Sequence, residues 1–167
     1  MTSPLAVAGL VTAGEQQLSL EDCRAFQAAH QVDLDQQQGG AALPWLDAGR
    51  AYRAVRFAAL MERAEPELDA RWVVFESADG ERAASLPLEE VALDAWIVYE
   101  CDGEALGDAA GGPFRLVIPG YRDPAAEISG LGRVEFADVP GRDTRDSRGA
   151  AAGPRCGERA GGDRRVG

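Results

Sequence analysis

The sequence predicts an α+β domain, with a mixed, mostly antiparallel sheet and short helices. Three observations predict this class. Many short apolar runs have the length of strands, few segments have helical spacing, and tight Gly-containing turns connect successive strands. The chain has 167 residues, of which 46% are hydrophobic and 27% are charged. This length and composition suit one globular domain with its own core.

The first half of the chain contains two expected strands and two expected helices. Leu5 to Val11 is an apolar run without a preceding basic region, which indicates an opening strand rather than a signal peptide. A helix is expected to begin at Ser19 as the N-cap, with Asp22 completing a capping box. Val32 to Leu34 is expected to be a short strand. Apolar residues at near-helical spacing predict a second helix over residues 55–64.

The second half of the chain is predicted to be strand-rich. Trp72 to Ser77 should pair through an Ala-Asp-Gly turn with Glu81 to Leu86, and Pro87 suits the first turn of a short helix through Val91. Asp102-Gly103 is the favoured pair for a type I′ turn. The remaining predicted strands are Ala95 to Cys101, Phe114 to Ile118 and Arg133 to Phe136.

The composition changes after Phe136. From Ala137 onward the chain is rich in Gly, Ala, Arg and Asp and has almost no large apolar residue, so burial cannot offset the entropy of ordering it. We therefore expect a folded domain over residues 1–136 and a disordered tail over residues 137–167. The tail has 7 arginines against 5 acidic residues, which concentrates the negative charge on the domain.

The charge and the cysteines limit the partners and the compartment. A net charge of −11 argues against nucleic acid, because phosphate contacts need a basic surface, and it leaves a basic protein as the candidate partner. No run of residues is long and apolar enough to span a membrane. Cys23, Cys101 and Cys156 are an odd, scattered set without CxxC spacing, which is typical of reduced thiols in a cytoplasmic protein.

Two stretches of the second half carry a family resemblance. WVVFESADGERAASLPLEEVALDAWIVYECDGEAL, over residues 72–106, is followed by GGPFRLVIPG, over residues 111–120. In this order the S-A-D-G turn, S-L-P-L, the D-G turn and G-P-x-R-L-V-x-P-G resemble the molybdopterin-binding domain of the sulfite oxidase family. The resemblance covers roughly Leu5 to Phe136. It implies that family's fold.

The resemblance also implies a cofactor and the residues that hold it. Family members bind a pyranopterin that carries molybdenum, with a cysteine thiolate on the metal and basic and polar side chains on the pterin and its phosphate. Thiolate sulfur is a soft ligand, and phosphate calls for cationic donors. Carried onto this chain, the resemblance gives Arg115, Gly120 and Tyr121 as the cofactor-binding candidates.

The sequence departs from this pattern at three places. The ligand cysteine is expected within Gln36 to Gly40, which has no cysteine, and the family's histidine before G-G-P is Ala110 here. Where the family has a lysine-rich stretch, this chain has Asp123 and Glu127. These two carboxylates would repel a phosphate, because both groups are negatively charged. The sequence thus predicts no catalytic residue, no metal ligand, and no cofactor in the purified protein.

The sequence leaves two functions open. The first is a non-catalytic relative of the molybdopterin-binding oxidoreductases that acts as a binding or scaffold module. The alternative is an active molybdopterin-dependent oxidoreductase whose metal is held without cysteine. The family is enzymatic and its key ligands are missing here, so the sequence does not decide whether this chain is an enzyme.

Overall fold

The computed structural model of the chain describes residues 3–34 and 49–145. Within these ranges the longest helix has 8 residues, and no helix is long and apolar enough to cross a membrane. The helices are α1 (Leu20–Ala25), α3 (Phe57–Ala64) and α4 (Leu88–Val91). The strands are β1 (Leu5–Gly9), β2 (Gln16–Leu18), β3 (Gln31–Leu34), β4 (Tyr52–Arg56), β5 (Trp72–Ser77), β6 (Ala83–Pro87), β7 (Trp96–Cys101), β8 (Glu104–Ala105), β9 (Arg115–Val117) and β10 (Leu131–Ala137).

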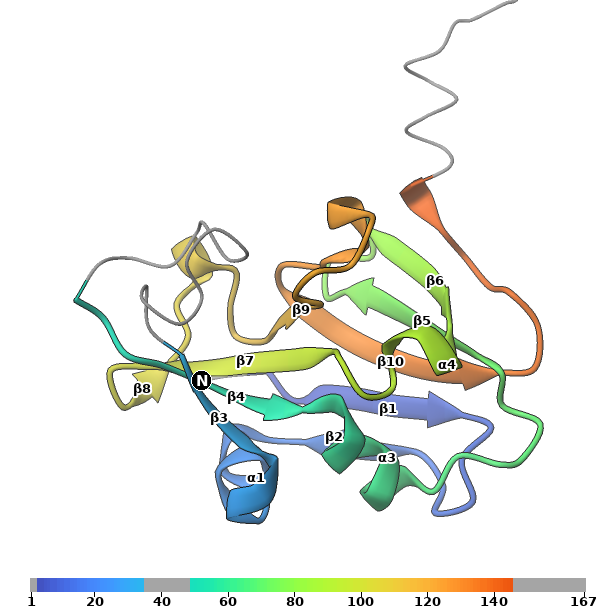
Figure 1. Cartoon of the computed structure of the whole chain (residues 1–167), viewed down its shortest axis with the longest axis horizontal. Coiled ribbons are helices and arrows are strands. Elements are labelled where there is room, and N and C mark those ends of the chain that lie inside the picture. The colour runs from blue at the N-terminus through green and yellow to red at the C-terminus, as the bar shows by residue number, and fades with distance from the viewer. Residues whose placement is uncertain (1–2, 35–48, 146–167) are drawn as a thin grey trace, which may run out of the picture.

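The described strands form two sheets (Figure 1). The first has the order β2-β1-β10-β5-β6. The second has the order β3-β4-β7-β8, and β9 also pairs with β7. Every pairing between these strands is antiparallel except that of β1 with β10, which is parallel. The predicted mixed, mostly antiparallel α+β class is confirmed.

The main hydrophobic core contains residues from both sheets and from the helices. Alternation along β5 and β10 buries Val73 and Phe75 on one strand and Val134 and Phe136 on the other. Phe57, at the start of α3, is fully buried against this sheet. Its ring centroid lies 5.3 Å from that of Phe75 and 5.8 Å from that of Phe136.

The first helix begins as the sequence predicts. The Ser19 hydroxyl accepts a hydrogen bond from the Asp22 backbone N–H at 3.1 Å, and the Asp22 carboxylate accepts one from the Ser19 N–H at 2.8 Å. These bonds satisfy donors that the first turn would otherwise leave unpaired. The predicted capping box is confirmed.

The helix predicted over residues 55–64 is wrong at its beginning. Residues 52–56 form β4, which lies between β3 and β7, and α3 begins only at Phe57. The strand is buried on both faces, because Tyr52 and Ala54 belong to one hydrophobic cluster and Val55 belongs to the main core. The helical spacing of the following residues concealed the strand.

The folded chain continues beyond the expected boundary at Phe136. Ala137 is the last residue of β10 and pairs with Trp72. The segment Gly141–Arg145 then lies along β6, where the Ser85 N–H donates to Asp143 Oδ2 and the Ala83 N–H donates to Thr144 Oγ1, each at 3.1 Å (Figure 1). The disordered tail predicted from residue 137 therefore does not hold for residues 137–145. Residues 146–167 lie outside the described residues.

The turn between β7 and β8 is the predicted one. Asp102 has φ 54° and Gly103 has φ 84°, the two positive values that a type I′ turn requires. No atom lies within 4 Å of a Cβ placed on Gly103, so a side chain there meets strain but no clash.

Replacing Gly103 with valine should therefore destabilise the protein by about 1 kcal/mol or more, because a β-branched residue is strained at positive φ. Urea unfolding monitored by circular dichroism would measure the change. Glu104→Val, at the next position along the chain, is the control, because Glu104 does not have a positive φ. An unchanged unfolding midpoint for Gly103→Val would show that the turn does not need glycine.

Candidate functional site

A second hydrophobic cluster lies on the face of β3, β4 and β7 that does not contribute to the main core. A β-bulge creates part of it: Arg53 pairs with Glu100 but Ala54 pairs with Val98, so one residue of β7 is extra. The extra residue shifts the alternation and places Cys101 on the same face as Val98. The buried members of this cluster are Leu34, Tyr52, Ala54, Val98, Cys101, Leu106 and Val117.

A pocket opens at the edge of this second cluster. It has a volume of about 320 Å³ and lies between the start of β4, the β7–β8 turn and the loop that follows β8. Leu34, the last described residue of β3, belongs to the same cluster, whereas Gln36 to Gly40 lie outside the described residues. We call this hollow the outer-face pocket. Its lining residues are Arg50, Tyr52, Cys101, Glu104, Ala105, Gly107, Ala109 and Ala110.

The charges at the outer-face pocket are mostly negative. Arg50 is the one cation among the lining residues, and its Nε donates to Asp102 Oδ2 at 2.9 Å. The Ala51 N–H also donates to Asp102. This backbone bond, with the Arg50 guanidinium, lowers the pKa of Asp102. Glu104 adds a second, exposed carboxylate, so the described wall is poorly suited to an anion.

A close backbone approach holds the loop that lines the pocket. The Gly112 N–H donates to the Gly107 carbonyl at 2.9 Å. A Cβ placed on Gly112 would lie 2.9 Å from the Gly107 carbonyl oxygen and still closer to the Leu106 carbonyl. Only glycine fits between these main-chain atoms. Gly112, the second residue of the G-G-P-F-R stretch, therefore fixes the path of the loop over residues 107–111.

Arg115 lies behind this loop and is not one of the residues that line the pocket. Its Nη1 donates to the Ala110 carbonyl at 3.1 Å. Burial lowers the pKa of the Arg115 guanidinium, an effect opposed by Glu127 and reinforced by Arg82. The side chain thus supports the pocket loop from beneath, at a half-buried position.

Gly120 and Tyr121 lie elsewhere, beyond the other end of β9. They line a different hollow together with Ile118 and Glu90. The Tyr121 hydroxyl donates to Glu90 Oε1 at 2.8 Å, and the Arg122 guanidinium lies 5.0 Å from the Tyr121 ring centroid. The structure therefore does not bring the three candidate cofactor-binding residues together.

The two acidic residues that replace the family's lysines have structural partners. Asp123 Oδ1 accepts from the Ala125 N–H, and its Oδ2 lies 2.9 Å from Arg145 Nη1. Glu127 Oε2 accepts from the Ile118 N–H at 3.0 Å. Burial raises the pKa of Glu127, against that backbone bond and the nearby Arg115. Both carboxylates hold the chain around β9.

The two described cysteines have opposite environments. Cys101 lines the outer-face pocket, whereas Cys23 lies on α1 with no exposed surface, inside the main core. Burial raises the pKa of the Cys23 thiol to about 12, and the Asp22 carboxylate acts in the same direction. Cys23 is thus a core residue and a poor source of thiolate. Cys156 lies outside the described residues.

The raised pKa of the Cys23 thiol predicts that the folded protein loses stability at alkaline pH. A thiol in the unfolded chain has a pKa of about 8.5, so the folded state holds its proton more tightly. The resulting stability is complete below that pH and is lost as the pH rises toward about 12. Between pH 8 and 10 this should amount to about 2 kcal/mol. Urea unfolding at both pH values would measure it; an equal loss in Cys23→Ala would contradict the assignment.

Arg50 and Tyr52 were not predicted to be pocket residues. Tyr52 lies on β4, which helical spacing concealed, and the pattern Tyr52, Ala54 was the available signal. In the sequence Cys101 is the last residue of a predicted strand and one of three scattered thiols. Its approach to the pocket depends on the β-bulge and on pairing with Tyr52, which are long-range features.

Comparisons with known proteins agree on the family and the fold. The family model described as "Oxidoreductase molybdopterin binding domain" matches residues 3–138. Among solved structures, the sulfane dehydrogenase SoxCD from Paracoccus pantotrophus has a TM-score of 0.66 and 22% sequence identity, covering 86% of this chain and 40% of that chain. The chain thus spans about two fifths of the solved chain's length. No significant match is found among curated proteins.

Proposed function

The chain belongs to the family of oxidoreductase molybdopterin-binding domains, and from that premise we propose that it is a non-catalytic member. It keeps the fold and acts as a binding or scaffold module. The observation that carries this proposal is the charge of the outer-face pocket, whose only described lining cation is already paired with Asp102.

The described residues of the pocket do not fit a phosphate-bearing pterin. A phosphate needs several cationic or N–H donors around it, and each desolvated donor has to be free to turn toward it. Arg50 is held by Asp102, Glu104 is anionic, and Ala110 presents a methyl group where the family has histidine. Arg115 donates to the loop beneath the pocket. We therefore derive no reaction through the cofactor.

The absence of the family's cysteine ligand supports the same proposal. Gln36 to Gly40 offers amides instead of the family's thiolate, and amides are weak ligands for a soft site. Of the two described thiols, the one in the main core is held protonated by burial. Loss of the ligand and of the phosphate donors together supports a module that binds through its surface.

The proposal predicts that the purified protein contains neither molybdenum nor pterin. The protein should be produced in a host that makes the cofactor, with a cysteine-bearing family member from the same host as the loading control. Metal analysis should give a molybdenum-to-protein ratio near zero, and oxidised pterin fluorescence should stay at background. A ratio near one would overturn the proposal.

One observation favours a second candidate, an active oxidoreductase in which a cysteine outside Gln36 to Gly40 ligates the metal. The Cys101 thiol lines the outer-face pocket, on the strand position paired with Tyr52. If the protein carries molybdenum, Cys101→Ser distinguishes this candidate from the alternative in which the metal is held without cysteine. Loss of the metal in Cys101→Ser would identify a substitute thiolate, and its retention would indicate ligation without cysteine.

A further inference from the structure

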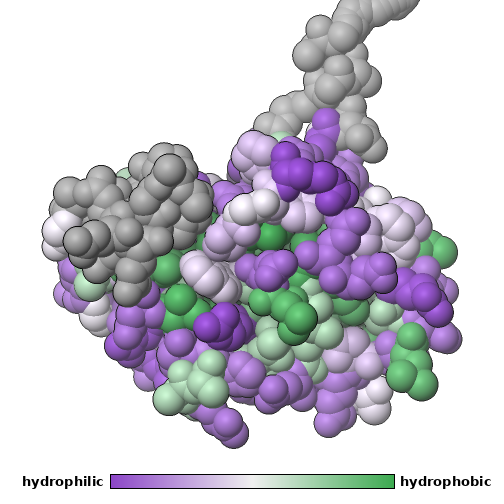
Figure 2. All heavy atoms as spheres, in the orientation of Figure 1, coloured by the Kyte–Doolittle hydropathy of each residue, from purple (hydrophilic) through white to green (hydrophobic). Residues whose placement is uncertain are grey.

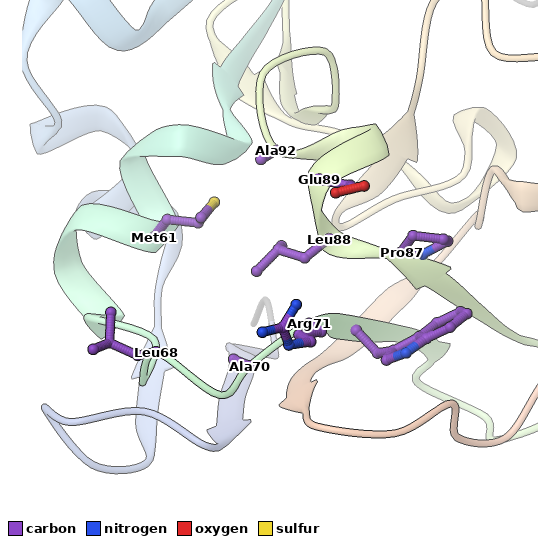
Figure 3. A pocket seen from close by; sticks show the side chains of 9 residues that line it. Met61, Leu68, Ala70, Arg71, Pro87, Leu88, Glu89 and Ala92 are labelled. Atoms are coloured by element: carbon purple, nitrogen blue, oxygen red, sulfur yellow. The ribbon is translucent and has the colours of Figure 1, made fainter.

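A groove on another face of the molecule lies between α3, α4 and the start of β5. It has a volume of about 550 Å³. In Figure 3 the side chains of Met61 and Leu88 lie on opposite sides of a common space, and Leu68 lies at its edge. We call it the α3–α4 groove. Its apolar walls are Met61, Leu68, Trp72, Pro87, Leu88 and Ala92.

The most exposed wall of the groove is rigidly presented. Leu68 has 99% of its surface exposed. It lies in a turn in which the Ala70 N–H donates to the Glu67 carbonyl at 2.9 Å, while the Glu67 N–H donates to the Leu10 carbonyl at 2.9 Å. Because these bonds already fix the main chain of the turn, a partner that covers Leu68 orders its side chain but not its backbone.

The apolar surface extends beyond the groove itself. Leu93, directly after α4, is 81% exposed. Figure 2 shows hydrophobic surface near α4 and near the segment between α3 and β5, with hydrophilic residues around it. Single exposed leucines are ordinary, but exposed leucines beside an apolar hollow mark an interaction surface.

The rim of the groove is acidic. Glu89 lines it, and Glu67 and Asp69 line an adjoining hollow that shares Leu68. None of these three carboxylates forms an ion pair or side-chain hydrogen bond with the part of the chain that the structure describes. Arg71 is the one cation among the residues lining the groove. The rim thus presents excess negative charge to whatever covers the apolar walls.

The negative charge of the rim limits which molecule can occupy the α3–α4 groove. A second copy would bring its own acidic rim against this one on a chain of net charge −11, which is unfavourable. The chain's own residues 146–167 contain arginines but almost no large apolar side chain to fill the hollow. A partner with a row of apolar anchors flanked by lysine or arginine satisfies both features.

We propose that the α3–α4 groove binds a basic, amphipathic helical segment of a partner protein. Its apolar face covers Leu68 and Leu88, and its cations face Glu67, Asp69 and Glu89. This mode is helix-in-groove recognition, in which apolar anchors at i, i+3, i+4 and i+7 give affinity and flanking charges give selectivity. The groove is separate from the outer-face pocket, so the inference stands whether or not that pocket holds a cofactor.

The test uses the full chain and a synthetic probe. The probe is a fluorescently labelled helical peptide with leucines at i, i+3, i+4 and i+7 and lysines beside them. One control peptide has the same composition with dispersed leucines, and another has glutamates in place of the lysines. Fluorescence anisotropy should show binding of the first peptide only, with a Kd below about 1 mM. Equal binding of any control peptide would overturn the proposal, as would no binding of the first.

Substitutions locate the binding. Leu68→Ser should weaken the peptide about tenfold or more without changing the melting temperature, because its side chain is exposed in the free protein. Val139→Ser is the matched control, since Val139 is 60% exposed and lines a different hollow. Equal effects of the two substitutions would place the peptide elsewhere and overturn the proposal.

The role of the acidic rim is tested with two triple variants of equal net charge. The triple change Glu67→Gln, Asp69→Asn and Glu89→Gln should weaken binding several-fold and reduce its salt dependence. The control triple neutralises Glu81, Asp108 and Asp138, which are also exposed. Equal weakening by both triples would reduce the effect to overall charge and overturn the proposed rim. Light scattering that shows a dimer lost in Leu68→Ser would assign the groove to a second copy instead.

Discussion

Gly112→Ala is expected to destabilise the folded protein by about 3 kcal/mol, because its Cβ has no space. The atoms that it would meet are the carbonyl groups of Leu106 and Gly107, which belong to the main chain. Side-chain rotation cannot relieve this overlap. The loop over residues 107–111 would have to move, and with it the wall of the outer-face pocket. Urea unfolding monitored by circular dichroism would measure the loss.

Gly107→Ala is the matched control for this prediction. It changes a glycine of the same loop at φ −75°, and no atom lies within 4 Å of its added Cβ. Its stability should therefore be unchanged or slightly increased, since alanine restricts the unfolded chain. Equal unfolding midpoints for Gly112→Ala and Gly107→Ala would contradict the close approach.

Phe57→Ala is expected to cost about 3–5 kcal/mol, the range for removing a buried aromatic ring. Phe57 has no exposed surface and contacts the rings of Phe75 and Phe136, one on β5 and one on β10. Its backbone N–H also donates to the carbonyl of Ala95, the residue before β7, and this bond holds the start of α3 beside β7. The cavity would open where the helix meets both strands, and thermal unfolding would record it.

Leu93→Ala is the comparison for Phe57→Ala. It removes a large apolar side chain of which 81% is exposed, so little buried contact is lost. Surface changes of this kind are usually within about 0.5 kcal/mol. A loss of several kcal/mol in Leu93→Ala, or none in Phe57→Ala, would mean that the assignment of core and surface is wrong.

Local patterns were sufficient for most elements of the fold. The Ser19 capping box, the Asp102-Gly103 turn and the hairpin of β5 with β6 all depend on residues close in sequence. The strand β4 was missed because tertiary pairing with β3 and β7 overrode a helical spacing that continues into α3. The parallel pairing of β1 with β10 joins the two ends of the domain, which no local pattern reports.

The candidate site was less predictable than the fold. Motif positions gave Arg115, Gly120 and Tyr121, and in the structure these lie at different ends of β9. The residues that line the outer-face pocket come together through the bulge opposite Arg53 and through the β7–β8 turn. Spacing along the chain cannot supply that geometry. The missing lysine-rich stretch, by contrast, could be identified from the sequence alone.

The segment Gly141–Arg145 bears on how this domain avoids association. β6 is the last strand of its sheet, and an open strand edge is a template for pairing with another chain. Here the side chains of Asp143 and Thr144 accept hydrogen bonds from the backbone N–H groups of Ser85 and Ala83, respectively. A chain shortened after Phe136 would keep every apolar strand yet present an unprotected edge to its neighbours. Protection of this strand edge is thus encoded in polar residues that lie after the last strand.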